Sequence, residues 1–296
     1  MRSKINAFLL AAVCIMLFGC NNDLAGEIES YEQEMEDIHE LDSTIQTQID
    51  SLDLEALQES INDMDNTLEA EDLDPRIEQL ENEILPEIED LESSLSDVKV
   101  DNEELNQVFG TFKENVDVKI DFTEALHEYL TTYQNSLVSS AQLVELSQSF
   151  MSNQEERNEV IENAAGDQEQ EEIDHIIDQV NENTTELEQQ SQILQSDASL
   201  EEKRDHIDEV LLPLIDEHIN TLNEMFLESQ GSVRVRSITL DMYYGFKQYY
   251  EERKQTILYN NVLQETQLQN ILPMKETYEK LNQEYDDSLE NLKSGG

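Results

Sequence analysis

The residue whose type and position point most directly to chemistry is Cys20, in the stretch LFGC. A short basic segment with Arg2 and Lys4 precedes it, followed by an almost unbroken apolar run, as in an export signal. Leu17 and Gly19 stand three and one residues before the cysteine, the spacing of a bacterial lipobox. In that motif the cysteine thiol accepts a diacylglyceryl group. We therefore predict lipid attachment at Cys20 and signal peptidase recognition through Leu17 and Gly19.

The apolar run is shorter than the roughly 20 residues of a membrane-spanning helix. This favours a cleaved signal peptide, residues 1–19, over an uncleaved anchor that happens to contain a cysteine. Cleavage would also remove Cys14 and leave Cys20 as the only cysteine, which excludes a disulfide. Because two acyl chains anchor a protein durably, we expect an extracytoplasmic protein tethered to the outer face of the cytoplasmic membrane.

The charge of the chain limits its partners. Asp and Glu number 69 against 17 Lys and Arg, for a net charge of −52. Such a surface repels nucleic acid, anionic lipid headgroups and wall polyanions, so we expect no nucleic-acid partner. The acidity is uneven, because residues 21–98 hold 27 acids and one base, whereas residues 231–296 hold 10 acids and 8 bases. The strongly acidic region should therefore stand off from the membrane.

Other arrangements that carry chemistry are missing from the sequence. None of the five histidines has a metal-ligand spacing, and the stretch NDMDNTLEAED lacks the central glycine of a calcium loop. The sequence has no Gly-rich phosphate loop and no G-x-S-x-G motif. We therefore expect no enzymatic activity, no metal and no cofactor.

Tyrosine is concentrated near the end of the chain, most densely in DMYYGFKQYYEERK. At about 100° per residue, two helix faces separate there. We interpret one face as core, with Ile238, Met242, Phe246, Tyr249 and Ile257. The adjoining face is a candidate wall or ligand surface, with Tyr243, Lys247, Tyr250 and Lys254. Tyrosine rings stack on sugars, and lysines meet carboxylates or phosphates. The alternative is a bundle flank from which both side-chain types reach toward water.

The elements that position these residues are long amphipathic helices, because apolar residues recur at steps of three and four. One stripe starts near Leu24 and gives a core position to Asp42. The longest runs from Leu105 through Val144 to Met151. We predict an all-α fold, an elongated antiparallel up-and-down bundle with coiled-coil-like helices. A lipidated tether at residues 20–26 precedes a single elongated domain at residues 27–293.

Helix boundaries are indicated by capping patterns and glycines. Asp74 before Pro75 is a predicted N-cap. Capping-box spacing occurs at Asp101 with Glu104 and at Ser199 with Glu202. Breaks are expected at Gly166 and Gly231. Prolines recur in ILPEIEDLE, LLPLIDEHI and ILPMKETYE, and matching kinks on neighbouring helices are one interpretation, with coincidence as the other.

The lipobox LFGC, the acidic stretch EIESYEQEMEDIHELD and the late region SITLDMYYGFKQYYEERKQTILYN resemble the cell-wall-binding lipoproteins of Gram-positive bacteria, the YkyA-like family. The resemblance covers essentially the mature chain. It implies an all-helical up-and-down bundle between membrane and wall, and it brings no catalytic residues.

The leading interpretation is a lipid-anchored, non-catalytic helical protein that contacts peptidoglycan or a wall-associated partner. The alternative is an adaptor whose grooves bind helices of a membrane or secreted protein without wall affinity. A hydrolase, or an accessory to one, is the third. Binding to purified peptidoglycan would separate the first two.

Overall fold

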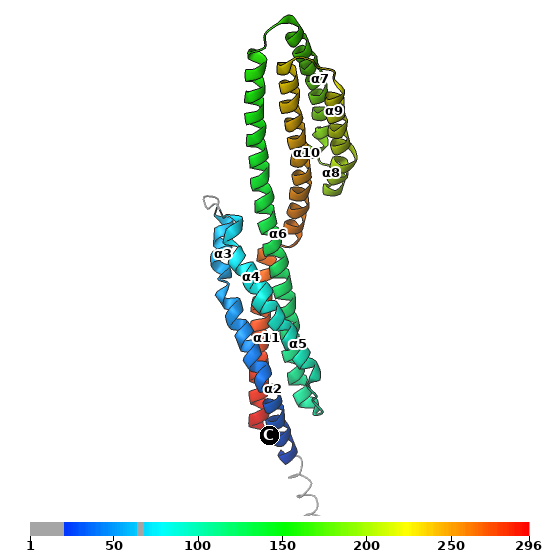
Figure 1. Ribbon diagram of the computed structural model, residues 1–296. Helices are drawn as coiled ribbons and strands as arrows, with labels where there is room; N and C mark the ends of the chain where they lie inside the picture. The colour runs from blue at the N-terminus through cyan, green and yellow to red at the C-terminus, as the bar shows by residue number, and fades with distance from the viewer. Residues whose placement is uncertain (1–20, 64–67, 296) are drawn as a thin grey trace, which may run out of the picture. The chain divides into compact units, whose positions relative to one another are not determined.

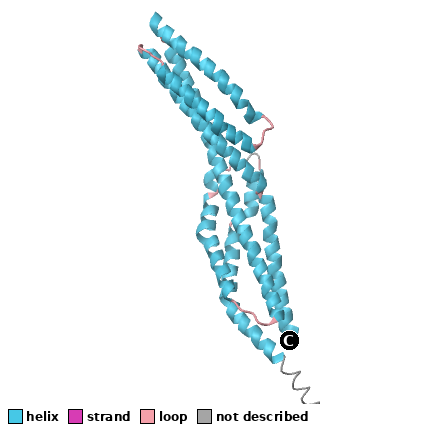
Figure 2. Ribbon diagram, turned by 90° about the vertical axis from the view of Figure 1, so that its right-hand side faces the viewer, coloured by secondary structure: helices cyan, strands magenta, loops and turns pink. Residues whose placement is uncertain are grey.

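The computed structural model describes residues 21–63 and 68–295, and these residues form helices and loops without a strand (Figure 2). The prediction of an all-α, bundle-like fold with long helices is thus confirmed. Leu17, Gly19 and Cys20 lie outside the described residues. The expected tether is helical from residue 21, where the helix α2 (Asn21–Ser51) begins.

The described chain divides into two compact units. Unit 1 comprises residues up to 131 together with residues from 266 onward, and unit 2 comprises residues 132–265. The longest helix, α6 (Glu103–Glu162), has its first half, residues 103–131, in unit 1 and its second half, residues 132–162, in unit 2. The single elongated domain expected for residues 27–293 stays a prediction.

Unit 1 is built from helices of the chain's beginning, middle and end (Figure 1). Its further elements are α3 (Leu54–Asn62), the 3-10 turn η1 (Ala70–Asp72), α4 (Asp74–Gln79), the π turn η2 (Leu80–Ile84), α5 (Leu85–Asp97) and α11 (Leu268–Gly295). The predicted apolar stripe of α2 is buried as expected, including Ile28, Met35, Ile45 and Ile49. The core of unit 1 therefore follows the periodicity read from the sequence.

Unit 2 contains α7 to α10 beside the second half of α6 (Figure 1). Its further elements are α7 (Asp167–Ser191), the 3-10 turn η3 (Gln192–Gln195), α8 (Leu200–His206), the π turn η4 (Ile207–Leu211), α9 (Leu212–Glu224) and α10 (Gln230–Glu265). Within the unit, α10 lies between the second half of α6 and the α7–α9 pair (Figure 1). The core cluster is formed mainly by α7, η4, α9 and α10.

The predicted capping boxes had different outcomes. At the start of α8, the Glu202 N–H donates to Ser199 Oγ over 3.2 Å, and the Ser199 N–H donates to Glu202 Oε2 over 2.8 Å, which confirms that box. At the start of α6 the prediction for Asp101 is wrong. Asn102 Oδ1 caps the helix instead, accepting from the N–H groups of Glu104 at 3.0 Å and Leu105 at 3.1 Å. Either residue can cap a helix, and α6 begins one position too late for Asp101.

Two of the three similar proline segments share one device. The π turns η2 and η4 stand directly before Leu85–Pro86 and Leu212–Pro213. A helical proline has no N–H, and its ring clashes with the carbonyl four residues earlier. The wider turn, closed by a bond from Leu85 N to the Leu80 carbonyl, lets the helix continue through the proline. Pro273 lies inside α11 without a π turn.

Candidate functional site

The predicted lipid-attachment site, Cys20 with Leu17 and Gly19, is outside the described residues, so it stays a prediction here. Within residues 21–63 and 68–295, no helix is long and apolar enough to cross a membrane. In the same residues, no group of three or more His, Cys, Asp or Glu side chains is placed to hold a metal ion.

The two tyrosines of the candidate wall surface do not lie on the surface. Tyr243 is 3% exposed and Tyr250 is 8% exposed, and both belong to the core cluster of unit 2. The Tyr243 ring meets the His218 ring edge to face at 5.8 Å between centroids. Burial raises the pKa of both tyrosines. The prediction of an exposed aromatic stripe is therefore wrong, because α10 packs against α7 and α9 on this side.

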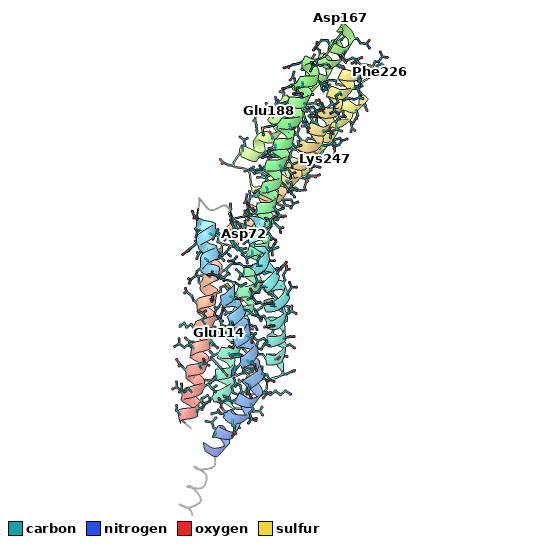
Figure 3. The ribbon with its side chains drawn as sticks, turned by 60° about the vertical axis from the view of Figure 1, so that its left-hand side comes forward. Asp72, Glu114, Asp167, Glu188, Phe226 and Lys247 are labelled. Atoms are coloured by element: carbon teal, nitrogen blue, oxygen red, sulfur yellow. The ribbon has the colours of Figure 1, made fainter. Side chains whose placement is uncertain are left out.

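The two lysines between these tyrosines bind acids of the same unit. Lys247, labelled in Figure 3, donates through Nζ to both carboxylate oxygens of Asp216 on α9, at 2.7 and 2.9 Å. This hydrogen bond raises the pKa of Lys247. Lys254 Nζ donates to Asp208 Oδ1 in η4 at 2.7 Å. Both lysines thus link α10 to the η4–α9 segment, which favours the bundle-flank interpretation.

The face of α10 that was interpreted as core is only partly so. Ile238, Met242 and Ile257 are buried, as predicted. Phe246 and Tyr249 are half-buried and border a groove. The fully buried face of α10 is thus rotated toward the tyrosines relative to the prediction.

The second half of α6 is packed far less than the sequence pattern indicated. Among residues 132–162, Ser139 is the only buried side chain. Val144 and Met151, predicted as members of the core stripe, are 57% and 55% exposed. That part of the prediction is wrong, because α10 covers α6 on one side and leaves these residues in water.

An apolar groove runs between α6 and α10 beside Met151. Its volume is about 350 Å³. The lining residues are Leu146, Ser147, Phe150, Met151, Gly245, Phe246, Tyr249 and Tyr250. The Phe150 and Phe246 rings pack across it with centroids 4.7 Å apart. A Cβ added to Gly245 would have no atom within 4 Å, so the groove is open above this glycine.

We call the surface formed by Val144, Ser147, Met151 and this groove the α6–α10 face. Its section of α6 is almost free of charge, since residues 129–154 contain one charged side chain, Glu145, in 26 residues. The chain as a whole is 29% charged. Sequence reasoning missed this face because the periodicity was read as internal core. The signal that could have found it is the local loss of charge.

Unit 1 contains a buried polar network that joins three helices. Lys119 on α6 forms an ion pair with Asp42 on α2, and both side chains are buried. Tyr285 Oη on α11 is 2.9 Å from His39 Nε2 and 3.1 Å from Tyr31 Oη. Burial raises the pKa of Tyr31 to about 12 and lowers that of His39. Burial therefore favours the neutral forms of Tyr31 and His39, and their hydrogen bonds to Tyr285 join α2 to α11.

Acidic side chains of α7 cap the start of α10. The Glu172 carboxylate accepts from Ser229 Oγ at 2.7 Å, from Ser229 N at 3.0 Å and from Ser232 Oγ at 2.5 Å. These hydrogen bonds lower its pKa to about 2. Glu169 accepts from Gly231 N at 2.8 Å, and a Cβ at Gly231 would come within 2.4 Å of that carboxylate. The expected break near Gly231 is a helix start built around these carboxylates.

These features define a class of protein: a helical bundle with structural buried polar contacts and an exposed, uncharged apolar face. The chain belongs to the family of EMYY-motif containing lipoproteins, which it matches over residues 1–293. The chain is thus a lipoprotein, a protein anchored to a membrane through lipid. Its sequence Met-Tyr-Tyr occurs once, at residues 242–244, preceded by Asp241. The match does not confirm the YkyA-like identity. No curated protein and no solved structure matches the chain.

Proposed function

We propose that this lipoprotein is a non-catalytic, extracytoplasmic adaptor that binds a partner through the α6–α10 face. The observation that carries the proposal is the exposure of Val144 and Met151 on a stretch of helix with a single charged side chain, Glu145, in 26 residues. Fully burying one such side chain is worth about 1.5–3 kcal/mol. A partner that covers the stripe and the groove beside it gains several of these contributions without desolvating a charged group.

Direct contact with the wall, the function favoured by the sequence, comes second. Its candidate surface was the Tyr–Lys stripe, whose tyrosines are buried and whose lysines are paired with Asp216 and Asp208. A net charge of −52 opposes binding to anionic wall polymers. A helical adaptor needs neither an exposed Tyr–Lys stripe nor attraction to anionic wall polymers. It uses the α6–α10 face, which the fold leaves exposed.

The test is photo-crosslinking of the full-length protein in its own membrane. A benzophenone amino acid replaces Val144 on the α6–α10 face or, as the matched control, Ser149, which is exposed on the same helix and lines a different groove with Gln142 and Glu145. We expect adducts from position 144 and few from position 149. No adduct from position 144 would overturn the proposal.

A pull-down distinguishes wall contact from the adaptor function. Full-length lipoprotein in detergent is incubated with purified peptidoglycan, with and without teichoic acid. We expect no retention above an acidic control protein. Specific retention that survives substitution of Val144 and Met151 by Gln would place wall contact ahead of the adaptor.

A further inference from the structure

We propose that the partner on the α6–α10 face is a second copy of this chain, packed face to face through the same residues. The inference rests on the proposed function and names the occupant of that site. Three observations carry it: the local loss of charge, the spacing of the exposed residues, and the open groove beside them.

The charge distribution favours self-association at this place. Two chains that each carry −52 repel one another over most of their surfaces. Residues 129–154, with Glu145 as their single charge, form a stretch where two copies can meet without facing like charges. A basic partner would instead be attracted to the acidic surfaces, and an uncharged face offers it nothing. The loss of charge thus fits a partner that is itself strongly acidic.

Val144 and Met151 are exposed and Leu137 is half-buried, and together they have the spacing of a helix–helix seam. Leu137, Val144 and Met151 follow one another at steps of seven, the repeat that keeps a stripe in contact with a partner helix. Ser140 and Ser147 lie between them at steps of three, so that small hydroxyl side chains flank the seam. In a two-fold symmetric pair the same patch serves both chains. The stripe is therefore complementary to its own copy.

The groove gives each copy a place to insert a side chain. It is open above Gly245 and lined by Phe150, Phe246 and Tyr249. Met151 stands at its rim. A methionine is unbranched and adapts its shape to irregular apolar spaces. In the pair, Met151 of one copy fills the groove of the other, which removes both the exposed side chain and the open space.

Cysteine crosslinking in the native membrane tests the contact. The chain has two cysteines. Cys14 lies in the predicted signal peptide, and Cys20 is the predicted lipidated residue. A single cysteine introduced as Val144→Cys or Met151→Cys therefore reports on its own pairing. We expect oxidation to give a disulfide-linked species of twice the chain's mass, several-fold more than Ser149→Cys on the same helix. Equal yields at the three positions, or none, would overturn the proposal.

A charge variant gives a second readout. Met151→Glu should abolish the dimer in detergent-solubilised full-length protein, measured by sedimentation, whereas Met151→Gln should weaken it less. Since the residue is exposed, both variants should unfold at the same denaturant concentration as the wild type. The wild-type dimer should strengthen with added salt, because screening reduces repulsion between the acidic copies. A monomer at all salt concentrations would contradict the inference.

The photo-crosslink at position 144 distinguishes this inference from the proposed function. An adduct of twice the chain's mass supports both. An adduct with a different protein leaves the adaptor standing and overturns the second copy. The absence of any adduct overturns both.

Discussion

The two halves of α6 carry the same apolar spacing and end up in opposite environments. In the first half, twelve side chains between Leu105 and Leu130 are buried, among them Phe112 and Lys119. In the second half, Ser139 alone is buried. Apolar periodicity therefore indicates that one face of a helix is apolar and favours burial. It does not indicate whether the same chain or another molecule buries that face. The charge of the surrounding sequence carries that second piece of information.

The two units also differ in the polar groups that they bury. Unit 1 buries an ion pair and a histidine–tyrosine network that join α2, α6 and α11. Unit 2 buries tyrosines of α10 and caps that helix with carboxylates of α7. The predictions below probe these contacts in order of expected effect.

The largest effect is expected at the buried ion pair. Lys119→Ala leaves Asp42 buried without its partner, and breaking such a pair costs about 3–5 kcal/mol. Urea unfolding followed by circular dichroism should show this loss. Lys113→Ala is the control. Lys113 is an exposed lysine on the same helix whose Nζ lies over the Phe109 ring, and its loss should cost about 1 kcal/mol or less.

The double variant Asp42→Leu with Lys119→Met sharpens that test. Replacing both charges by apolar side chains removes the desolvation cost together with the attraction, so most of the lost stability should return. A double variant as unstable as the single one would show that the pair stabilises unit 1 through more than mutual neutralisation.

The next effect separates two neighbouring tyrosines of the Met-Tyr-Tyr sequence. Tyr243 is buried against His218, whereas Tyr244 is 49% exposed. Tyr243→Ala opens a cavity in unit 2 and should cost about 3 kcal/mol or more, in the range of large aromatic truncations. Tyr244→Ala should change the free energy of unfolding by about 0.5 kcal/mol or less. Equal effects from the two variants would contradict the burial pattern of α10.

The smallest effect concerns the acid dependence of unit 2. The pKa of Glu172 is lowered to about 2, so its stabilising contribution is present above its unfolded pKa of about 4.3 and is lost as pH falls toward 2. Glu172→Gln should therefore be less stable than the wild type at neutral pH, with the difference shrinking between pH 5 and pH 2. Thermal melting across this range measures it. Glu171→Gln, at an exposed position on the same helix, is the matched control.

Much of the fold could be predicted because helix formation depends on the spacing of apolar and capping residues that are close in the sequence. The buried stripe of α2, the break at Gly166 and the Ser199 capping box all depend on residues within a few positions of one another. Asp42 was recognised as a polar residue at a core position. Its partner Lys119 was not, because their pairing depends on which helices become neighbours.

The candidate site was predicted less well, for a related reason. On α10 two apolar faces adjoin, and spacing alone does not tell which one meets α7 and α9. The face with Met242 and the face with Tyr243 are both buried, while Phe246 turns toward the groove. Tyrosine suits either a surface or a core edge, so residue type did not decide between them.

The two π turns suggest that the helical segments containing them can be exchanged between the two units. A π turn closes a ring one residue longer than an α-helical turn, and here each is followed at the same distance by a proline, Pro86 or Pro213. The two segments can therefore be aligned residue by residue with an offset of 127 residues. Grafted on this offset, residues 80–95 would place apolar side chains onto four buried apolar positions of residues 207–222, but Glu92 would fall on the buried position of Ile219. The matched pairs are Leu80 with Ile207, Ile84 with Leu211, Ile88 with Ile215 and Leu95 with Leu222. A chimera of this kind, with Glu92 replaced by Ile, would transplant one π turn and the proline-containing helix that follows it into the other unit.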